Sequence, residues 1–334
     1  MKPCKTVVAS ALALFCLSLA RVAAQPLPAT AELAKALGFT PAEIARIEAG
    51  EIVSKDLKEG SDKELAGVVA VLFKKPVAEL AEIAVQGKLL ETDKKIQAFG
   101  AWKPDEAVDK ALASLKLDAT ESDEVEIFSR ASTGDKLNLS AAEIEQFRKT
   151  KRDAGAVSAE LRSMLKARYE AYRKSGLNGI APYVRGGNKT AKPGEELALA
   201  IKETMTAAPR KDFFQALLDY PAKPLANVEH HFYWFKQEVE GRPTFILSHR
   251  TSRSSSNAAI MSEEQFYVGH SYNSNLIIGG GLEVKGGTLV FYVNRTFTDQ
   301  VAGFASGMRH NIGRGRMLDE VATKLKRARD ELKK

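Results

Sequence analysis

The five histidines are the side chains best suited to chemistry, and all of them lie in the last third of the chain. They are His230, His231, His249, His270 and His310. Imidazole acts as a general acid or base near neutral pH, and with Glu229 or Glu238 it could hold zinc or copper. The spacing matches no metal-binding pattern, and the sequence H-E-x-x-H is absent. We therefore predict no metal site, no catalytic residue and no cofactor, and expect these histidines to form hydrogen bonds within or beside a sheet.

Arg295 is the charged residue for which a structural role and a ligand-binding role can be distinguished most clearly. On the last predicted strand, one face carries in succession Leu289, Phe291, Val293, Arg295 and Phe297. An arginine in an apolar row must be paired, exposed at the strand end, or in contact with a polar group of a ligand. The structural explanation is exposure or a pair with Glu283 or Asp299. The functional explanation is a ligand carboxylate or phosphate.

Aromatic residues concentrate in the same late region, where 15 of the 25 lie between residues 213 and 304. Aromatic side chains on both faces of adjacent strands need apolar cover on both sides, or a ligand on one side. An ordinary packed core is the structural alternative. The candidate ligand-binding residues are Trp234, His249, His270, Tyr272, Phe291 and Arg295.

Two further stretches resemble catalytic or binding motifs only superficially. Residues 251–257 are rich in serine, but no G-x-S-x-G sequence is nearby, so we predict a surface loop there. The three glycines at 279–281 lack the G-x-G-x-x-G spacing and a following helix. They therefore predict no phosphate site.

The elements that position these residues change in character along the chain. We predict short helices over 30–37 and 41–49, the second with a capping box formed by Thr40 and Glu43. Strands are predicted over 51–57 and 67–73, then a helix over 77–85 and a strand over 95–102. The run 68–73 is wholly apolar, so that strand should be buried on both faces.

Helices then dominate from about residue 104 to residue 222. A second capping box, at Ser140 and Glu143, opens one of them. Amphipathic or helical patterns also cover 158–174, 195–207 and 211–220.

Strands return after residue 227. The pattern predicts a hairpin over 230–238 and 244–249, then one long or two short strands over 265–284, interrupted at the glycines 279–281. A turn at 285–287 leads to the clearest strand, 288–297. A long helix follows, capped by Thr298 or Asp299. Its glycines at 303, 307 and 315 predict a close approach to the sheet, with a break near 313–315 as the alternative. The fold class is thus α+β, an antiparallel sheet gripped by a long C-terminal helix, with a large helical insertion.

This order of elements resembles the helix-grip fold of START and polyketide-cyclase-like proteins. The run Gly286 to Arg295, followed by the long helix, carries most of the resemblance, which covers roughly residues 227–332. The helical section departs from the family pattern. The resemblance implies a cavity between the sheet and the C-terminal helix that takes a lipid, a sterol or another apolar molecule.

The first 24 residues have the order of a secretory signal peptide. Lys2 and Lys5 precede an apolar stretch over 7–20, and Val22-Ala23-Ala24 offers small residues for cleavage. Cleavage after Ala24 would remove both cysteines of the chain, Cys4 and Cys16. It would also remove three of the basic residues behind the net charge of +7, leaving +4. We expect a periplasmic or secreted protein without disulfides and without a nucleic-acid partner.

The predicted organisation has four parts: a signal peptide at 1–24, N-terminal helices and first strands at 25–103, the helical insertion at 104–222, and late strands with the C-terminal helix at 223–334. The leading hypothesis is an exported protein that binds or shuttles an apolar, lipid-like ligand, with peripheral membrane contact through its basic C-terminal helix. One alternative is a cyclase- or hydrolase-like enzyme of the same architecture that uses His249, His270 or Arg295. Another is a cell-envelope interaction protein that docks through residues 104–222.

Overall fold

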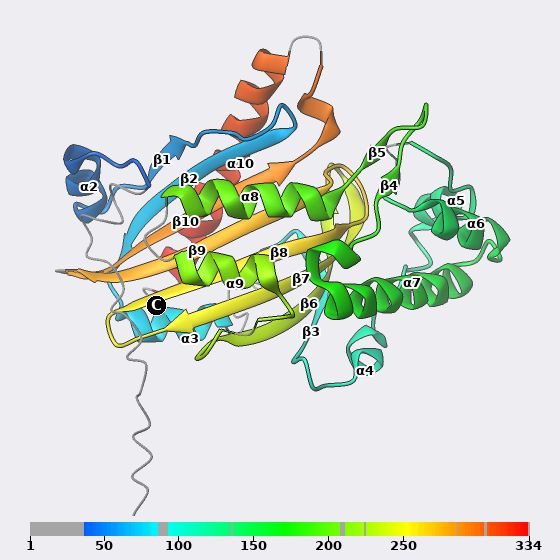
Figure 1. Cartoon of the computed structure of the whole chain (residues 1–334), viewed down its shortest axis with the longest axis horizontal. Coiled ribbons are helices and arrows are strands. Elements are labelled where there is room, and N and C mark those ends of the chain that lie inside the picture. The colour runs from blue at the N-terminus through cyan, green and yellow to red at the C-terminus, as the bar shows by residue number, and fades with distance from the viewer. Residues whose placement is uncertain are drawn as a thin grey trace, which may run out of the picture.

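The computed structural model describes residues 37–85, 93–134, 136–207, 211–223, 225–284, 286–303 and 306–332. The predicted signal peptide and all but the last residue of the predicted helix 30–37 lie outside the described residues. Within them the fold is α+β (Figure 1).

A large antiparallel sheet forms the centre of the molecule. Its strand order is β1-β2-β10-β9-β8-β7-β6-β3. The strand bounds are β1 Val53–Asp56, β2 Glu64–Phe73, β3 Ile96–Trp102, β6 Glu229–Val239, β7 Arg242–Ser254, β8 Ala258–Val268, β9 Ser274–Val284 and β10 Gly287–Phe297. A small separate hairpin pairs β4 Tyr183–Val184 with β5 Thr190–Ala191.

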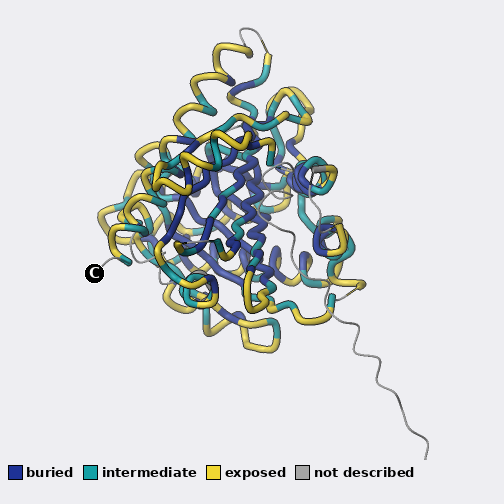
Figure 2. The backbone as a smooth tube through the Cα atoms, turned by 90° about the vertical axis from the view of Figure 1, so that its left-hand side faces the viewer, coloured by how far each residue is buried: buried dark blue, intermediate teal, exposed yellow. Residues whose placement is uncertain are grey.

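Helices cover both faces of this sheet. The described helices are α2 Pro41–Glu48, α3 Val77–Val85, α4 Val108–Leu112, α5 Ser122–Ser129, α6 Ala141–Lys149, α7 Ala154–Ser175, α8 Pro193–Ala207, α9 Lys211–Asp219 and α10 Ser306–Glu331, with 3-10 turns at Gly176–Gly179 and Asp299–Val301. Helices α7, α8 and α9 lie on one face, which we call the helical face, and α3 and α10 lie on the other (Figure 1). The strands are the buried middle layer between these helices (Figure 2).

Several local predictions are confirmed. All ten residues of β2 are buried, as the continuous apolar run predicted. Both capping boxes are present: Thr40 and Glu43 begin α2, and Ser140 and Glu143 begin α6. The hairpin turns between β6 and β7 and between β9 and β10 also lie where the sequence placed them.

Two predictions about the late strands are wrong. Residues 251–254 are not loop, because β7 continues to Ser254 and pairs with β8 over this stretch and with β6 as far as Ser252. The glycines at 279–281 do not interrupt a strand but lie inside β9, and β8 begins earlier than predicted, at Ala258. Neighbouring strands on both sides satisfy the backbone hydrogen bonds of these segments, which outweighs their low strand propensity.

The C-terminal helix also differs from the prediction. Thr298 caps the 3-10 turn Asp299–Val301, and α10 begins only at Ser306 and continues without a break to Glu331. A Cβ atom added at Gly307 or Gly315 would meet nothing within 4 Å, so these glycines do not provide a close approach. Gly313 does, since its Cβ would lie 3.0 Å from the side chain of Leu65 on β2. In the described ranges no helix has the length and apolar character needed to cross a bilayer.

Candidate functional site

A cavity of about 610 Å³ lies between the sheet and the two helices α3 and α10. Its floor comes from strands β7 to β10, and its cover comes from α3 and the C-terminal half of α10. Apolar side chains such as Val77, Leu80 and Leu325 line most of it. This volume is within the range of ligand-binding cavities for small organic molecules.

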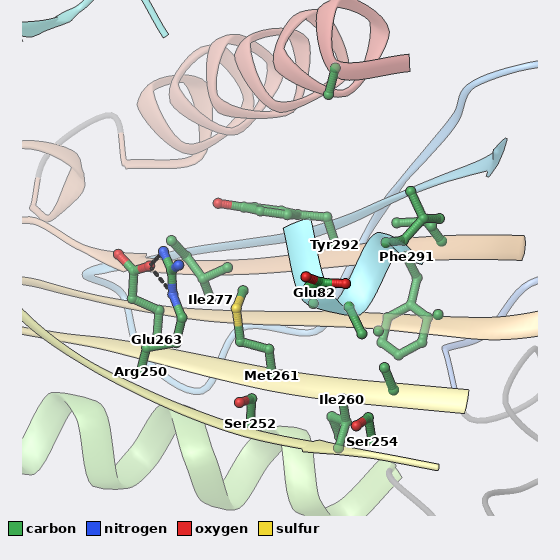
Figure 3. Close-up of a pocket in the computed structure, with 18 of the residues that line it drawn as sticks. Glu82, Arg250, Ser252, Ser254, Ile260, Met261, Glu263, Ile277, Phe291 and Tyr292 are labelled. Carbon is green, nitrogen blue, oxygen red and sulfur yellow. Dashed lines mark hydrogen bonds and ion pairs between the residues drawn. The ribbon is translucent and has the colours of Figure 1, made fainter. Parts of the chain in front are cut away.

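The cavity exists because β9 lacks side chains where it forms the floor. Gly279 and Gly281 lie on the cavity face of the strand, and both line the cavity. A Cβ atom at Gly279 would have only the flexible end of Met261 nearby, at 3.4 Å. The intervening Gly280 faces the other way, and the ring of Phe291 occupies the space beside it. Figure 3 shows Phe291 and Tyr292 on opposite sides of β10, with Tyr292 on the α10 side.

One end of the cavity is polar. Nη2 of Arg250 donates to Oε2 of Glu263 over 2.6 Å, and Nε of the same guanidinium donates over 3.2 Å (Figure 3). The guanidinium also lies over the ring of Tyr233, 4.4 Å from its centroid. Burial alone would lower the pKa of Arg250, but the attraction and hydrogen bond of Glu263, together with Tyr233 and Tyr292, outweigh burial and raise that pKa. Arg250 is therefore a buried cation with the Glu263 carboxylate as its ion-pair partner.

Neutral hydrogen-bonding groups surround this ion pair. Nε2 of Gln265 is 3.4 Å from Oε1 of Glu263, and the hydroxyl of Tyr272 donates to Oε1 of Gln265 over 2.7 Å. The side chain of Tyr292 points from β10 towards the pair (Figure 3). Burial raises the pKa of Tyr292, so its hydroxyl stays protonated and is able to donate. The polar end thus offers donors and acceptors without net charge.

The predicted site residues are divided between the two faces of the sheet. Of the six, only Phe291 lines the large cavity, while Tyr272 reaches it indirectly through Gln265. Trp234 is on the helical face, where its indole Nε1 donates to the carbonyl of Ala111 over 2.6 Å. Trp234 therefore does not line the sheet–α10 cavity.

His249 is also on the helical face, in a buried hydrogen-bonded cluster. Its Nδ1 is 2.9 Å from the hydroxyl of Tyr172, and its Nε2 is 2.9 Å from Nδ1 of His230. Oε2 of the fully buried Glu264 is 3.5 Å from Nδ1. A cavity of only about 10 Å³ adjoins the cluster, enough for about one water molecule. His249 therefore does not reach the large cavity.

The ionisable groups of this cluster are neutral near pH 7. Burial, and next the proximity of His230, holds the pKa of His249 well below its usual value. Burial raises the pKa of Glu264 to about 8. Burial also raises the pKa of Tyr172, so the hydroxyl keeps its proton and shares a hydrogen bond with Nδ1 of His249.

The remaining two candidates have structural partners. His270 bonds through Nε2 to the hydroxyl of Thr244 at 2.6 Å and through Nδ1 to that of Ser271 at 2.7 Å. Arg295 shares a face with Phe291, as predicted, but pairs with neither Glu283 nor Asp299 and is not exposed. Its Nη1 donates to Oε1 of the fully buried Glu64 on β2 over 2.7 Å. Neither residue lines the cavity, so both assignments are corrected.

The other histidines are dispersed. His230 contacts His249, whereas the adjacent His231 points to the opposite face, as strand alternation predicted. Nδ1 of His310 on α10 is 2.8 Å from the carboxylate of Glu59. Across the described part of the chain, no three His, Cys, Asp or Glu side chains are grouped so that they could hold a metal ion.

The sequence interpretation missed Arg250, Glu263, Gly279, Gly281 and Tyr292. The only signal for Arg250 and Glu263 in the sequence is that each is a charged residue within a few positions of strongly apolar residues. Their partnership depends on the register of β7 with β8, in which they are directly opposite each other. That register is not visible in either segment alone.

Comparisons of the chain with protein-family models, curated proteins and solved structures find no match.

Proposed function

We propose that this protein binds an apolar ligand that carries a neutral hydrogen-bonding group, in the cavity between the sheet and α10. The observation that carries the proposal is the combination of a cavity of about 610 Å³ with mainly apolar walls and the buried Arg250–Glu263 pair at one end. An apolar body would displace water from the glycine floor and from Val77, Leu80 and Leu325. A hydroxyl or carbonyl group at its end would bond to the groups around Arg250 and Glu263.

The charge balance of the polar end argues for a neutral ligand. A ligand carboxylate or phosphate would gain Arg250 as a partner but would also lie beside Glu263, which is only 2.6 Å from that guanidinium. Transferring an anionic ligand from water into this cavity is costly when the nearest cation is already paired with another carboxylate. A neutral alcohol, sterol-like molecule or ester avoids this cost.

The setting of this activity is part of the proposal. The N-terminal residue order supports export, so we place the protein in the periplasm or outside the cell. The order of the described elements, with strands, helix, strand, helical section, antiparallel strands and terminal helix, supports the proposed relationship to the helix-grip superfamily. The protein would act as a carrier or reservoir and perform no reaction.

Contact with a membrane fits such a carrier. The large apolar side chains that are exposed among the described residues are Met308, at 68%, and Ile312, at 51%. They are four residues apart, on the first turns of the basic helix α10. We propose that these turns touch the surface of an anionic bilayer when the ligand is exchanged.

The two alternative functions receive less support. The enzyme hypothesis needs His249, His270 and Arg295 at one cavity, but His249 adjoins the cavity of about 10 Å³ and the other two line neither cavity. The docking hypothesis needs an exposed apolar patch on residues 104–222. Among the described residues, the large exposed apolar side chains are instead on α10.

Native mass spectrometry of the purified protein tests the proposal, together with solvent extraction and lipid analysis. We expect a co-purifying or titratable neutral apolar molecule at one per chain. If no molecule co-purifies and the protein shows no saturable uptake of alcohols, sterols or esters, the proposal is contradicted.

A further inference from the structure

Helix α10 is held to the sheet differently on its two flanks. On one flank, Leu318, Val321 and Leu325 pack with β2 and β10 in a continuous apolar contact that includes Val69 and Tyr292. Ala328 extends this contact towards the end of the helix. Such packing excludes water and is not weakened by salt.

The other flank is held by charged side chains that join α10 to the residues just before β3. Nζ of Lys324 is 3.0 Å from Oδ2 of Asp93 and 3.4 Å from Oε1 of Glu320. Nζ of Lys95 is 3.1 Å from that same Glu320 oxygen. We call these four residues the charged bridge. Asp93 and Lys324 also line the cavity, so the bridge is part of its wall.

The bridge is formed by full charges but is open to solvent. Burial alone would raise the pKa of Asp93 and Glu320, yet the nearby Lys324 keeps both pKa values below their usual range. The side chains of Lys95, Glu320 and Lys324 are 48%, 42% and 39% exposed, whereas that of Asp93 is 11% exposed. Ion pairs with this exposure are individually weak and are screened by salt. The charged bridge is therefore a part of the cavity wall that salt or a charge reversal can weaken.

We propose that the charged bridge is a latch through which the ligand enters and leaves the cavity. When Lys324 and Lys95 separate from their acidic partners, the C-terminal half of α10 moves away from the residues before β3. The apolar flank stays packed and acts as the hinge. This inference rests on the proposed function for its ligand, although the movement itself can be tested without one.

The test is the release rate of the neutral fluorescent probe N-phenyl-1-naphthylamine, measured by stopped flow. In Lys324→Glu, three acidic side chains would meet at the bridge, and we expect release to become about tenfold faster. Association should accelerate by a similar factor, so that the affinity changes less than either rate. The double variant Asp93→Lys with Lys324→Glu restores an opposite-charge pair and should bring both rates back towards the wild-type values.

Two further measurements are the salt dependence of release and the release rate of a matched control variant. Raising NaCl from about 50 mM to about 500 mM should speed release from the wild type but not from a variant with all four bridge residues made neutral. Lys166→Glu breaks an ion pair of 2.7 Å with Asp109, far from the cavity in the helical section, and should leave the rates unchanged. Release from Lys324→Glu within twofold of wild type, with no effect of salt, would overturn the latch.

A second readout separates this inference from the proposed function. Amide hydrogen exchange of the unliganded protein should be faster in Lys324→Glu than in wild type over 321–331, and unchanged in Lys166→Glu. If the probe does not bind but exchange changes as expected, the proposed function is contradicted, whereas the proposed opening of α10 at the charged bridge is supported. Unchanged exchange over 321–331 would contradict the latch whether or not the probe binds.

Discussion

Arg250 and Glu263 neutralise each other in the wall of the cavity, with Nη2 and Oε2 only 2.6 Å apart and both side chains almost fully buried. They are opposite each other on β7 and β8, so the sheet register fixes the pair. The pair makes the cavity polar at one end without giving it a net charge.

The first prediction concerns the charge of the ligand. In Glu263→Gln, the Arg250 cation loses its partner, so the cavity should prefer an anionic amphiphile to a neutral one. We expect displacement of N-phenyl-1-naphthylamine by oleyl alcohol to weaken relative to displacement by oleate, with the preference shifting by about tenfold or more. Competition titrations at one ionic strength measure the ratio.

The control for this prediction replaces both partners with apolar residues. Arg250→Met with Glu263→Met removes the charges together and should fold with similar stability, because matched apolar residues often replace a buried pair without loss. It should still exclude oleate. An unchanged alcohol-to-oleate ratio in folded Glu263→Gln would show that this pair does not select the ligand.

The second prediction concerns the stability of the helical face at different pH values. Glu264 has a pKa of about 8 in the folded protein, against an ordinary value of 4.5, because it is buried. Between these values the unfolded chain releases a proton that the folded chain keeps, so the contribution of Glu264 to stability falls as pH rises from 4.5 to about 8. This fall amounts to up to about 5 kcal/mol of unfolding free energy, and Glu264→Gln should abolish it.

Urea unfolding at several pH values measures this effect. The profile of unfolding free energy against pH should be flatter for Glu264→Gln than for wild type over this interval. Glu238→Gln, which changes an exposed carboxyl on β6, is the matched control and should leave the profile as it is. Parallel profiles for Glu264→Gln and wild type would mean that Glu264 is ionised in the folded protein.

The third prediction separates Arg295 from ligand binding. Arg295→Met leaves the fully buried Glu64 without its cation, and we expect a loss of about 3–5 kcal/mol in unfolding free energy. Adding Glu64→Gln should recover part of that loss. Both variants should bind N-phenyl-1-naphthylamine as the wild type does, since the Arg295 pair does not line the cavity. If the folded double variant binds the probe tenfold more weakly than the wild type, Arg295 contributes to ligand binding and this prediction is wrong.

Local sequence signals predicted much of the fold. The capping boxes at Thr40 and Ser140 depend on residues three apart, and the all-apolar β2 needs no information from the rest of the chain. The serine stretch and the triple glycine were misread because their strand conformation depends on neighbours. The ring of Phe291, distant in sequence, fills the space beside Gly280 and gives that glycine its place in the sheet.

The site was predicted less well than the fold, for a reason of geometry. Alternation correctly placed Phe291 and Arg295 on one face of a strand and separated His230 from His231. Alternation does not say which face of the sheet is turned towards α10. Trp234, His249 and Arg295 are on the face covered by the helical section. Several residues that line the cavity are one position away in the sequence, as Arg250 is from His249.

Titration of N-phenyl-1-naphthylamine into wild type and Gly279→Leu, followed by fluorescence, tests the central claim most directly. A leucine at residue 279 would project into the cavity, where the flexible end of Met261 is the only atom within 4 Å of its Cβ among the described residues. The control, Gly315→Leu, adds the same side chain to an open position on α10. We predict saturable binding at one site in wild type and Gly315→Leu, and at least about tenfold weaker binding in Gly279→Leu. Absence of saturable binding in wild type, or equal affinity in folded Gly279→Leu, would contradict a ligand site between the sheet and α10.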